Sequence, residues 1–207
     1  MKEISLLILI QSRLNSARFP GKALHKINDV PLILRVYKQI KKSKYRNKVV
    51  VALSNAQSDN KLAFFLKEKK INFFRGSLNN VAKRLFDTSI KHKSKFFMRI
   101  NGDSPLIKPS IINRAIELHK KNKKYDIITN VMPRTYPKGQ SVEIISTEIL
   151  NKYLKFFNKF DKEHVTTFFY KQKNLFLIKN FKSKLLRSKI NQCIDYPSDI
   201  KRLNKYF

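Results

Sequence analysis

Short apolar runs alternate with amphipathic stretches through the first 130 residues of this 207-residue chain. Apolar runs of about four to eight residues suit buried strands, whereas apolar residues three or four positions apart suit the inner face of a helix. The strands predicted in this way cover residues 6–10, 48–53, 71–74, 95–100 and 126–130. The predicted helices cover 31–42, 59–70, 79–92 and 110–121, with Asp59 as the N-cap of the second. This alternation predicts an α/β fold: a Rossmann-like, mostly parallel sheet with helices on both faces.

The pattern is less regular after residue 130. It predicts strands at 141–145, 175–181 and 190–194, and helices at 147–157, 162–170 and 197–206. Residues 131–190 are therefore expected to cap the edge of the sheet, and 191–207 to supply a closing strand and helix. A chain of this length without a low-complexity linker predicts one domain over residues 1–207, with 1–130 as its α/β core.

Three polar loops, at 11–22, 75–79 and 101–105, each follow a predicted strand. Because the carboxyl ends of parallel strands share one edge of the sheet, we expect these loops to lie together, where open α/β sheets bind ligands. The first loop carries Arg13, Arg18 and Lys22, which are suited to phosphate. Neither a Walker loop nor the G-x-G-x-x-G fingerprint of dinucleotide sites occurs. The alternative interpretation of this loop is a basic surface turn.

Two aspartates are the sharpest acidic candidates. Asp103 and Asp195 each follow an apolar run and come shortly before a proline. Carboxylates at the ligand-binding edge can hold Mg²⁺, which prefers oxygen ligands. The alternative role of either residue is to form a turn or cap a helix. Asp199 is interpreted as such a cap.

The remaining ionisable groups indicate no other site. His164 is expected to be structural and to lie between two helices, whereas His25, His92 and His119 are expected at the surface. No His/Cys cluster has zinc spacing. The single cysteine excludes a disulfide framework and fits the cytosol.

The composition is strongly basic, with 45 Lys and Arg against 14 Asp and Glu and a net charge of +31. Such a charge raises nucleic acid or an anionic membrane as partners. The basic residues are spread along the whole chain, however, so we expect no specific nucleic-acid partner. No apolar run is long enough to insert into a membrane. The N-terminal apolar run, with Glu3 before it and no small-residue cleavage site after it, is interpreted as a first strand rather than a signal peptide.

The first loop, S-R-x-x-S-x-R-x-P-G-K-x-L from Ser12 to Leu24, resembles the nucleotide-binding loop of the cytidylyltransferases that activate sugar acids. That family includes CMP-sialate and CMP-Kdo synthetases, and the closest likeness is to the spore-coat polysaccharide type. Five other segments carry the same resemblance, with N-G-D-S-P-L-I at 101–107 and I-D-Y-P-S-D-I at 194–200 the sharpest. F-R-G-S at 74–77, G-Q-S-V-E at 139–143 and E-H-V-T at 163–166 are also similar. Asn15, Phe19, Asn79, Asn80 and Ser141 depart from the family pattern.

The resemblance implies transfer of CMP from CTP to a hydroxyl of an acidic sugar, with release of pyrophosphate, for surface polysaccharide biosynthesis. The fold would be that of nucleotide-diphospho-sugar transferases. The cofactor would be Mg²⁺, and the enzyme a cytoplasmic homodimer with 131–190 as its acceptor and dimerisation region. Because Ser141 replaces the usual aspartate, sialic, legionaminic and pseudaminic acids, Kdo and other acceptors all stay open.

The resemblance also implies roles for individual residues. The residues predicted to be catalytic are Arg13, Lys22 and Asp103. Those predicted to bind the nucleotide are Gln11, Ser12, Arg13, Ser16, Arg18, Lys22, Arg75, Gly76, Ser77, Arg84, Asn101 and Gly102. Those predicted to bind the acceptor are Arg99, Gln140, Glu143 and His164. The predicted metal ligands are Asp103 and Asp195.

Two other function classes compete with this interpretation. A glycosyltransferase that uses a nucleotide sugar usually carries Asp-x-Asp after a strand, but Asp103 is followed by Ser104 and Pro105. A basic nucleic-acid-binding protein would need an aromatic-studded basic stripe or a reader helix. Neither stands out in the sequence, so the cytidylyltransferase interpretation is favoured.

Overall fold

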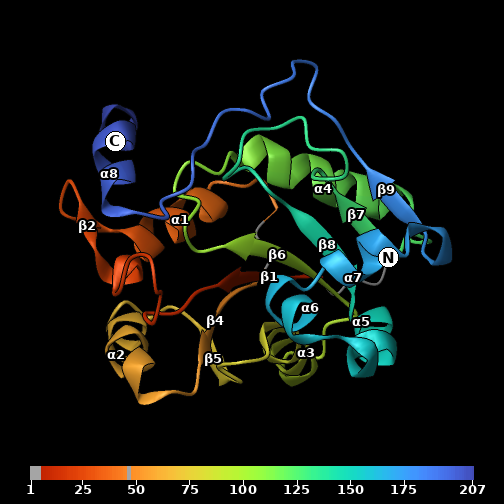
Figure 1. Ribbon diagram of the computed structural model, residues 1–207, viewed down its shortest axis with the longest axis horizontal. Coiled ribbons are helices and arrows are strands. Elements are labelled where there is room, and N and C mark those ends of the chain that lie inside the picture. The colour runs from red at the N-terminus through yellow and green to blue at the C-terminus, as the bar shows by residue number, and fades with distance from the viewer. Residues whose placement is uncertain (1–5, 46–47) are drawn as a thin grey trace.

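Seven strands form one sheet in the computed structural model, which describes residues 6–45 and 48–207 (Figure 1). Their order across the sheet is β5-β4-β1-β6-β8-β7-β9. The strands are β1 (Leu6–Gln11), β4 (Val49–Ser54), β5 (Phe73–Gly76), β6 (Phe96–Asn101), β7 (Ile127–Thr129), β8 (Glu143–Ser146) and β9 (Ile178–Asn180). All neighbours pair in parallel except β8, which runs antiparallel to both β6 and β7. The prediction of a mostly parallel α/β sheet is confirmed.

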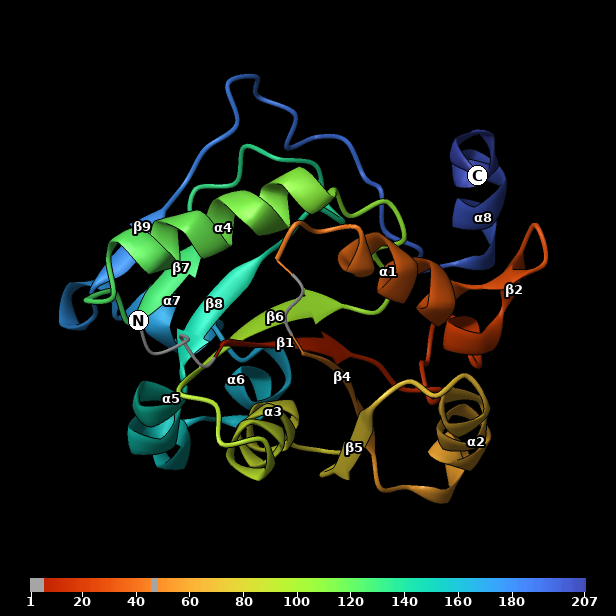
Figure 2. The ribbon, with the colours of Figure 1, turned by 180° about the vertical axis from the view of Figure 1, so that it is seen from behind.

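Helices cover both faces of this sheet (Figure 2). They are α1 (Leu32–Lys41), α2 (Asn60–Glu68), α3 (Val81–Lys91), α4 (Pro109–Lys121), α5 (Thr147–Tyr153), α6 (Lys159–His164), α7 (Thr167–Lys171) and α8 (Pro197–Leu203). Side chains alternate along β1, so Ile8 packs in a core with α1, α2 and α4, while Leu9 packs in a second core with α3, α5 and α7. No helix within the described residues has the length and apolar character needed to cross a membrane.

The strand ends bring the three polar loops to one edge, as predicted. Gly102, just after β6, donates its backbone N–H to the carbonyl of Gln11 at the end of β1, at 2.9 Å. A Cβ atom on Gly102 would lie 2.9 Å from that carbonyl oxygen and 2.9 Å from the Cβ of Ser12. Glycine at this position therefore allows the loop that carries Asp103 to approach the first loop closely.

The expectation that residues 131–190 only cap the edge of the sheet is wrong. Strand β8 inserts between β6 and β7 and is buried along its whole length. Ile144 and Ile145 point to opposite cores, which is why this strand is apolar on both sides. The predicted strand at 175–181 is also shorter, because a 3₁₀ turn at Lys173–Leu175 precedes β9.

The single helix predicted at 162–170 is wrong, because the chain breaks at Val165 between α6 and α7. Val165 has φ 59° and ψ −59°, and the Thr166 N–H bonds to the His164 carbonyl at 2.7 Å across it. This is a classic γ-turn, which is rare and strained, above all for a β-branched residue. The Val165 side chain is fully buried in the core against α3 and α5, which offsets that strain.

The strand predicted at 190–194 is also wrong. Among the described residues this segment makes one isolated bridge, between Lys138 and Asn191. It is held instead by Arg202 of α8, which donates to the carbonyls of Asn191 and Cys193. Helix α8 packs Leu203 into a third cluster with Phe19 of the first loop and with Ile194, so the C-terminal segment is joined to that loop.

His119 on α4 was expected at the surface, and that prediction is wrong. It is 1% exposed and packs edge-on against Phe96, with the two ring centres 4.4 Å apart. Neither of its ring nitrogens has a hydrogen-bond partner among the described residues. It falls on the inner face of α4 with Ala115 and Ile116. Burial, with a smaller contribution from the charge of Lys123, lowers its pKa from 6.5 to about 4.

We therefore expect acid to destabilise the fold through His119. A lowered pKa means that the unfolded chain takes up a proton near pH 6.5 that the folded chain resists until about pH 4. The stability that neutral His119 contributes is complete above pH 6.5 and is lost as the pH falls through 4, by up to roughly 3 kcal/mol.

Urea unfolding between pH 7 and 4 measures this loss. His119→Leu should flatten the profile, and His25→Leu, at an exposed position, should not; identical profiles for all three proteins would contradict the prediction.

Candidate functional site

The first loop is tied down by a buried carboxylate. Asp59 Oδ1 accepts the Leu14 N–H at 2.6 Å, and its Oδ2 accepts the Ser54 N–H at 2.8 Å and the Ser54 hydroxyl at 2.5 Å. Asp59 is the N-cap residue of α2, as predicted, but its side chain makes no capping bond there. Because the side chain is fully buried and joins the loop to β4, it fixes where the loop leaves the sheet.

The loop then turns back on itself at Gly21. This residue has φ 75°, a left-handed conformation that glycine adopts without strain, and its N–H bonds to the Leu14 carbonyl at 2.9 Å. Phe19 is buried in the cluster with α8, while Arg18 is exposed. The turn therefore anchors the apolar side chain and leaves Arg18 and Lys22 at the edge of the sheet.

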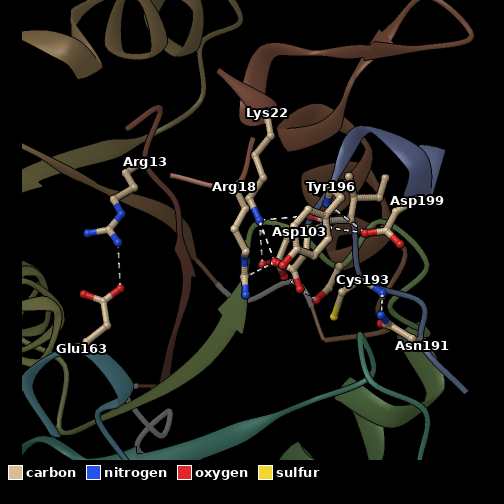
Figure 3. A network of polar contacts seen from close by, with 12 residues as sticks. Arg13, Arg18, Lys22, Asp103, Glu163, Asn191, Cys193, Tyr196 and Asp199 are labelled. Carbon is tan, nitrogen blue, oxygen red and sulfur yellow. Dashed lines mark hydrogen bonds and ion pairs between the residues drawn. The ribbon is translucent and has the colours of Figure 1, made fainter. Parts of the chain in front are cut away.

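Lys22 contacts both aspartates that the sequence singled out, and Figure 3 shows its side chain reaching towards Asp103. Its Nζ is 3.1 Å from Asp103 Oδ2 and 3.3 Å from Asp195 Oδ1, and it donates to the Ile194 carbonyl at 3.0 Å. Arg18 Nη2 is 2.6 Å from Asp195 Oδ1. We call Asp103 and Asp195 the carboxylate pair. Its two side chains converge on one cation, although the strand that was expected to carry Asp195 does not form.

The segment around Asp195 is held from both sides. Asp199 Oδ2 accepts the N–H groups of Asp195 and Tyr196 at 2.8 and 2.9 Å, which is the predicted capping role. Burial alone would raise the pKa of Asp199, but hydrogen bonds from Arg202 and from these two N–H groups lower it. On the other side, the Ile194 N–H donates to the Asp103 carbonyl at 2.9 Å. The carboxylate pair is therefore joined through the backbone as well as through Lys22.

Cys193 lies beside this pair but is not a nucleophile. Burial, followed by the negative charges of Asp103 and Asp195, raises the pKa of its thiol to about 12. The thiolate is the reactive form of cysteine, so this residue stays neutral and inert near neutral pH.

A cavity of about 150 Å³ lies beside the carboxylate pair. We call it the nucleotide cavity because most of the residues that the sequence predicts to bind nucleotide line it. It is lined by Gln11, Ser12, Arg13, Ser16, Arg18, Lys22, Ala23, Arg84, Gly102, Asp103 and Glu163. Of the other residues predicted to bind nucleotide, Arg75 donates to the carbonyls of Ser54 and Ala56, and Ser77 accepts through its carbonyl from Arg84. Gly76 ends β5, and Asn101 ends β6.

Arg84 is the buried cation of this cavity. It is 1% exposed, Nη1 donates to the Ser77 carbonyl at 2.8 Å, and Nε has no partner within the described residues. Burial, and then the charge of Arg13, lower its pKa to about 10, so it stays protonated at neutral pH. A buried donor without a partner is costly, which makes Arg84 suited to an anionic or carbonyl-bearing ligand.

Glu163 is the charged residue of this cavity to which the sequence assigned no role. Its Oε1 is 3.0 Å from Arg13 Nη2, although the two residues are 150 positions apart in the sequence. The sequence signal for Glu163 was its place in the E-H-V-T segment. Its ion pair with Arg13 could not be predicted, because it depends on the γ-turn at Val165 and on the packing of α6. Glu163 neutralises Arg13 and holds it at the wall of the cavity.

Three of the four residues predicted to bind the acceptor lie together, because Arg99 Nη1 contacts both Glu143 and, at 3.4 Å, the carbonyl of His164. Gln140 lies apart from them. Arg99 Nη1 is 2.7 Å from Glu143 Oε2, and Arg99 Nε donates to Gln11 Oε1 at 2.9 Å. Glu143 Oε1 also accepts the hydroxyls of Thr166 and Tyr170 at 2.8 and 2.6 Å. Burial, and then the charge of Glu143, raise the pKa of Tyr170, so Tyr170 remains a hydrogen-bond donor.

The other two predicted acceptor residues differ in exposure. His164 is exposed, and its ring lies 4.2 Å from that of Phe160. Gln140 is 1% exposed and is held by three hydrogen bonds: its Oε1 accepts the Lys108 N–H, and its Nε2 donates to the Leu106 carbonyl and to Gln192 Oε1. Gln140 therefore lies behind the loop that carries Asp103.

The carboxylate pair has the chemistry of a small hard-cation site. Both side chains offer oxygen, and the ammonium of Lys22 shows that one cation contacts both of them. Within residues 6–45 and 48–207 no group of three or more His, Cys, Asp or Glu side chains is placed to hold a metal. A cation held by two carboxylates would complete its shell with water or phosphate oxygens, as Mg²⁺ commonly does.

A family described as cytidylyltransferase matches residues 7–205 of the chain. An uncharacterized protein of Methanocaldococcus jannaschii is 31% identical over 206 residues, which cover 96% of this chain and 83% of that protein. The spore coat polysaccharide biosynthesis protein SpsF of Bacillus subtilis is 26% identical over 150 residues, or 70% of this chain. The 3-deoxy-manno-octulosonate cytidylyltransferase of Rickettsia canadensis is 29% identical over 138 residues, or 64% of this chain. The chain matches only 60% and 54% of the length of these last two proteins.

Solved structures have the same fold. A cytidylyltransferase from Leptospira borgpetersenii serovar Hardjo-bovis is 27% identical, with a TM-score of 0.93 over 99% of this chain and 88% of that one. A CMP:2-keto-3-deoxy-manno-octonic acid synthetase solved with CTP is 15% identical, with a TM-score of 0.75 over 97% of each chain. The second likeness is one of fold alone.

Proposed function

This chain belongs to the cytidylyltransferase family, and we propose that it transfers CMP from CTP to a hydroxyl of an acidic sugar, releasing pyrophosphate. The observation that carries the proposal is the convergence of Arg18, Lys22 and the carboxylate pair beside the nucleotide cavity. Cations for a triphosphate and carboxylates for its metal meet there at the carboxyl edge of a parallel sheet, where such folds bind nucleotides.

In the proposed reaction the acceptor hydroxyl attacks the α-phosphorus of CTP, and pyrophosphate leaves. Arg18 and Lys22 bind the triphosphate and neutralise the charge that builds up on the departing pyrophosphate. Arg13, held by Glu163, and the open donor of Arg84 bind the nucleotide at the opposite end of the cavity. Catalysis then rests on positioning and on charge neutralisation by groups that are already oriented.

The carboxylate pair would hold Mg²⁺ in this proposal. When bound, the ion would supply Lewis-acid neutralisation of the phosphates and polarisation of the acceptor hydroxyl. Asp199 and the Ile194 N–H keep Asp195 and Asp103 in place for that role. Lys22 must exchange a carboxylate for a phosphate when nucleotide and metal enter together.

The acceptor is proposed to lie on the β8 side of the site, within reach of Arg99. Its guanidinium has one terminal nitrogen, Nη2, that makes no hydrogen bond in the described part of the chain, and a guanidinium suits a carboxylate. Glu143, with Tyr170 and Thr166, fixes the orientation of Arg99. An acceptor of the sialic, legionaminic, pseudaminic or Kdo type would serve surface polysaccharide biosynthesis. A cytoplasmic homodimer is part of the same proposal.

We expect CTP with Mg²⁺ to raise the melting temperature more than UTP, ATP or GTP do. A ligand that binds only the folded state stabilises it according to its concentration relative to Kd, so thermal shift reports selectivity directly. Pyrophosphate release with CTP and a panel of sugar acids then identifies the acceptor. An equal response to all four nucleotides, or none to any, would contradict the cytidylyl proposal.

A further inference from the structure

A second, larger cavity of about 770 Å³ lies behind the loop that carries Asp103. We call it the α4 cavity, because residues at the N-terminal end of α4 line it, together with residues from 183–192 and Tyr206. It is lined by Leu106, Lys108, Ser110, Ile111, Arg114, Tyr136, Pro137, Gln140, Ser183, Lys184, Leu185, Arg187, Ile190, Gln192 and Tyr206. None of these residues lines the nucleotide cavity, so the two are separate spaces.

The charged lining of the α4 cavity has one sign. Lys108, Arg114, Lys184 and Arg187 line it, and no acidic residue does. None of these four makes an ion pair with another described residue, whereas Arg13, Arg18 and Lys22 of the nucleotide cavity are each paired with a carboxylate. All four residues are exposed, so solvent and salt weaken their mutual repulsion, but their unpaired positive charge favours a bound anion.

One of the four cations is fixed in place. Arg114 Nη1 donates to the Tyr136 hydroxyl and to the Lys182 carbonyl, both at 2.9 Å, and its guanidinium lies 5.3 Å from the centre of the Phe181 ring. Its Nε and Nη2 make no hydrogen bond in residues 6–45 and 48–207. The charge therefore stays at the cavity wall with donors to spare, at little further cost in side-chain entropy.

Most of the remaining lining is apolar or aromatic. Ile111 is buried, Leu106 and Tyr136 are partly buried, and Leu185 and Ile190 are 58% and 46% exposed. We propose that the α4 cavity binds an amphiphilic organic anion, with its apolar body against Leu106 and Ile111 and its carboxylate or phosphate at Arg114 and Lys108. This is a site additional to those of the nucleotide and the acceptor.

The wall of this cavity is continuous with the carboxylate pair. Leu106 lies three residues after Asp103, and Gln192 lies three residues before Asp195. Gln140 binds both halves of the wall, through the Leu106 carbonyl and Gln192 Oε1. A ligand that moves Leu106 or Gln192 also shifts a member of the carboxylate pair, so occupancy should change the affinity for metal and nucleotide.

The test uses the fluorescent anion 8-anilinonaphthalene-1-sulfonate, with uncharged N-phenyl-1-naphthylamine as its control, on the full chain. We expect one sulfonate dye per chain and much weaker binding of the uncharged dye. Arg114→Met and Lys108→Met should each weaken dye binding about tenfold, the effect of losing one charge-assisted contact. Lys121→Met, at the far end of the same helix, is the matched control and should bind as the unaltered chain does.

Competition identifies the ligand class and separates this site from the others. Phenyl phosphate should displace the dye if the cavity prefers phosphate, and 4-phenylbutyrate should displace it if the cavity prefers carboxylate. Benzyl alcohol, which is uncharged, should not displace it. CTP with Mg²⁺ should change dye affinity without abolishing binding. Lys108→Met keeps the test valid if Arg114→Met does not fold, because the Lys108 side chain makes no hydrogen bond in the described structure. Unchanged binding in the folded variants, equal binding of the uncharged dye, or full displacement by CTP or by a sugar acid would overturn the proposal.

Discussion

Replacing Lys22 by methionine is expected to lower turnover more than tenfold and, at the same time, to raise the affinity for Mn²⁺ measured without nucleotide. The two effects have opposite sign because the ammonium has two roles. In the free protein it lies 3.1 and 3.3 Å from the carboxylate pair, where it competes with any metal. In the proposed complex the same charge binds phosphate. Electron paramagnetic resonance of free Mn²⁺ measures the affinity for the metal, and pyrophosphate release measures turnover.

The matched control for this substitution is Lys26→Met, which removes an exposed lysine four positions away. It should change neither quantity. Methionine retains most of the apolar stem of Lys22, and Arg18 still neutralises Asp195, so the melting temperature should fall by no more than a few degrees. Unchanged turnover together with unchanged Mn²⁺ affinity would mean that the loop is only a basic surface turn.

Features that depend on neighbouring residues were predictable from the sequence. The apolar runs before Gln11 and Asn101 predict strands, and their alternation with helices predicts parallel pairing. From this it follows that Lys22 and Asp103 reach one edge of the sheet. Their direct contact at 3.1 Å was not predicted, because it depends on the turn at Gly21 that brings Lys22 back to the edge.

Features that depend on distant partners were not predictable in this way. Asp59 looks like a helix cap, but its carboxylate binds Leu14, 45 positions away. The γ-turn at Val165 contradicts local propensity and persists because tertiary packing buries its side chain. His119 has a polar side chain on the inner face of a helix, and the periodicity that placed Ala115 inward applied equally to it.

The second large effect is expected from the carboxylate pair itself. Asp103→Asn and Asp195→Asn should each lower turnover about a hundredfold or more, raise the Mg²⁺ concentration needed for half-maximal rate, and weaken Mn²⁺ binding without nucleotide. The geometric reason is that both side chains contact the same cation, Lys22, in the free protein. Asparagine keeps the shape of each side chain, and the backbone bond from Ile194 to Asp103 is unaffected, so the fold should remain intact.

The double variant decides whether Asp103 and Asp195 act as one site. If they hold one metal, removing the second ligand from a site already emptied costs little, so the combined loss should be far smaller than the product of the single losses. Asp29→Asn is the control: it removes a carboxylate from an exposed turn with φ 61°, which asparagine also adopts readily. Multiplicative losses would mean that the two carboxylates act independently. A folded Asp195→Asn variant with normal metal dependence would leave Asp195 only its ion pairs with Arg18 and Lys22, and would assign the metal to Asp103 alone.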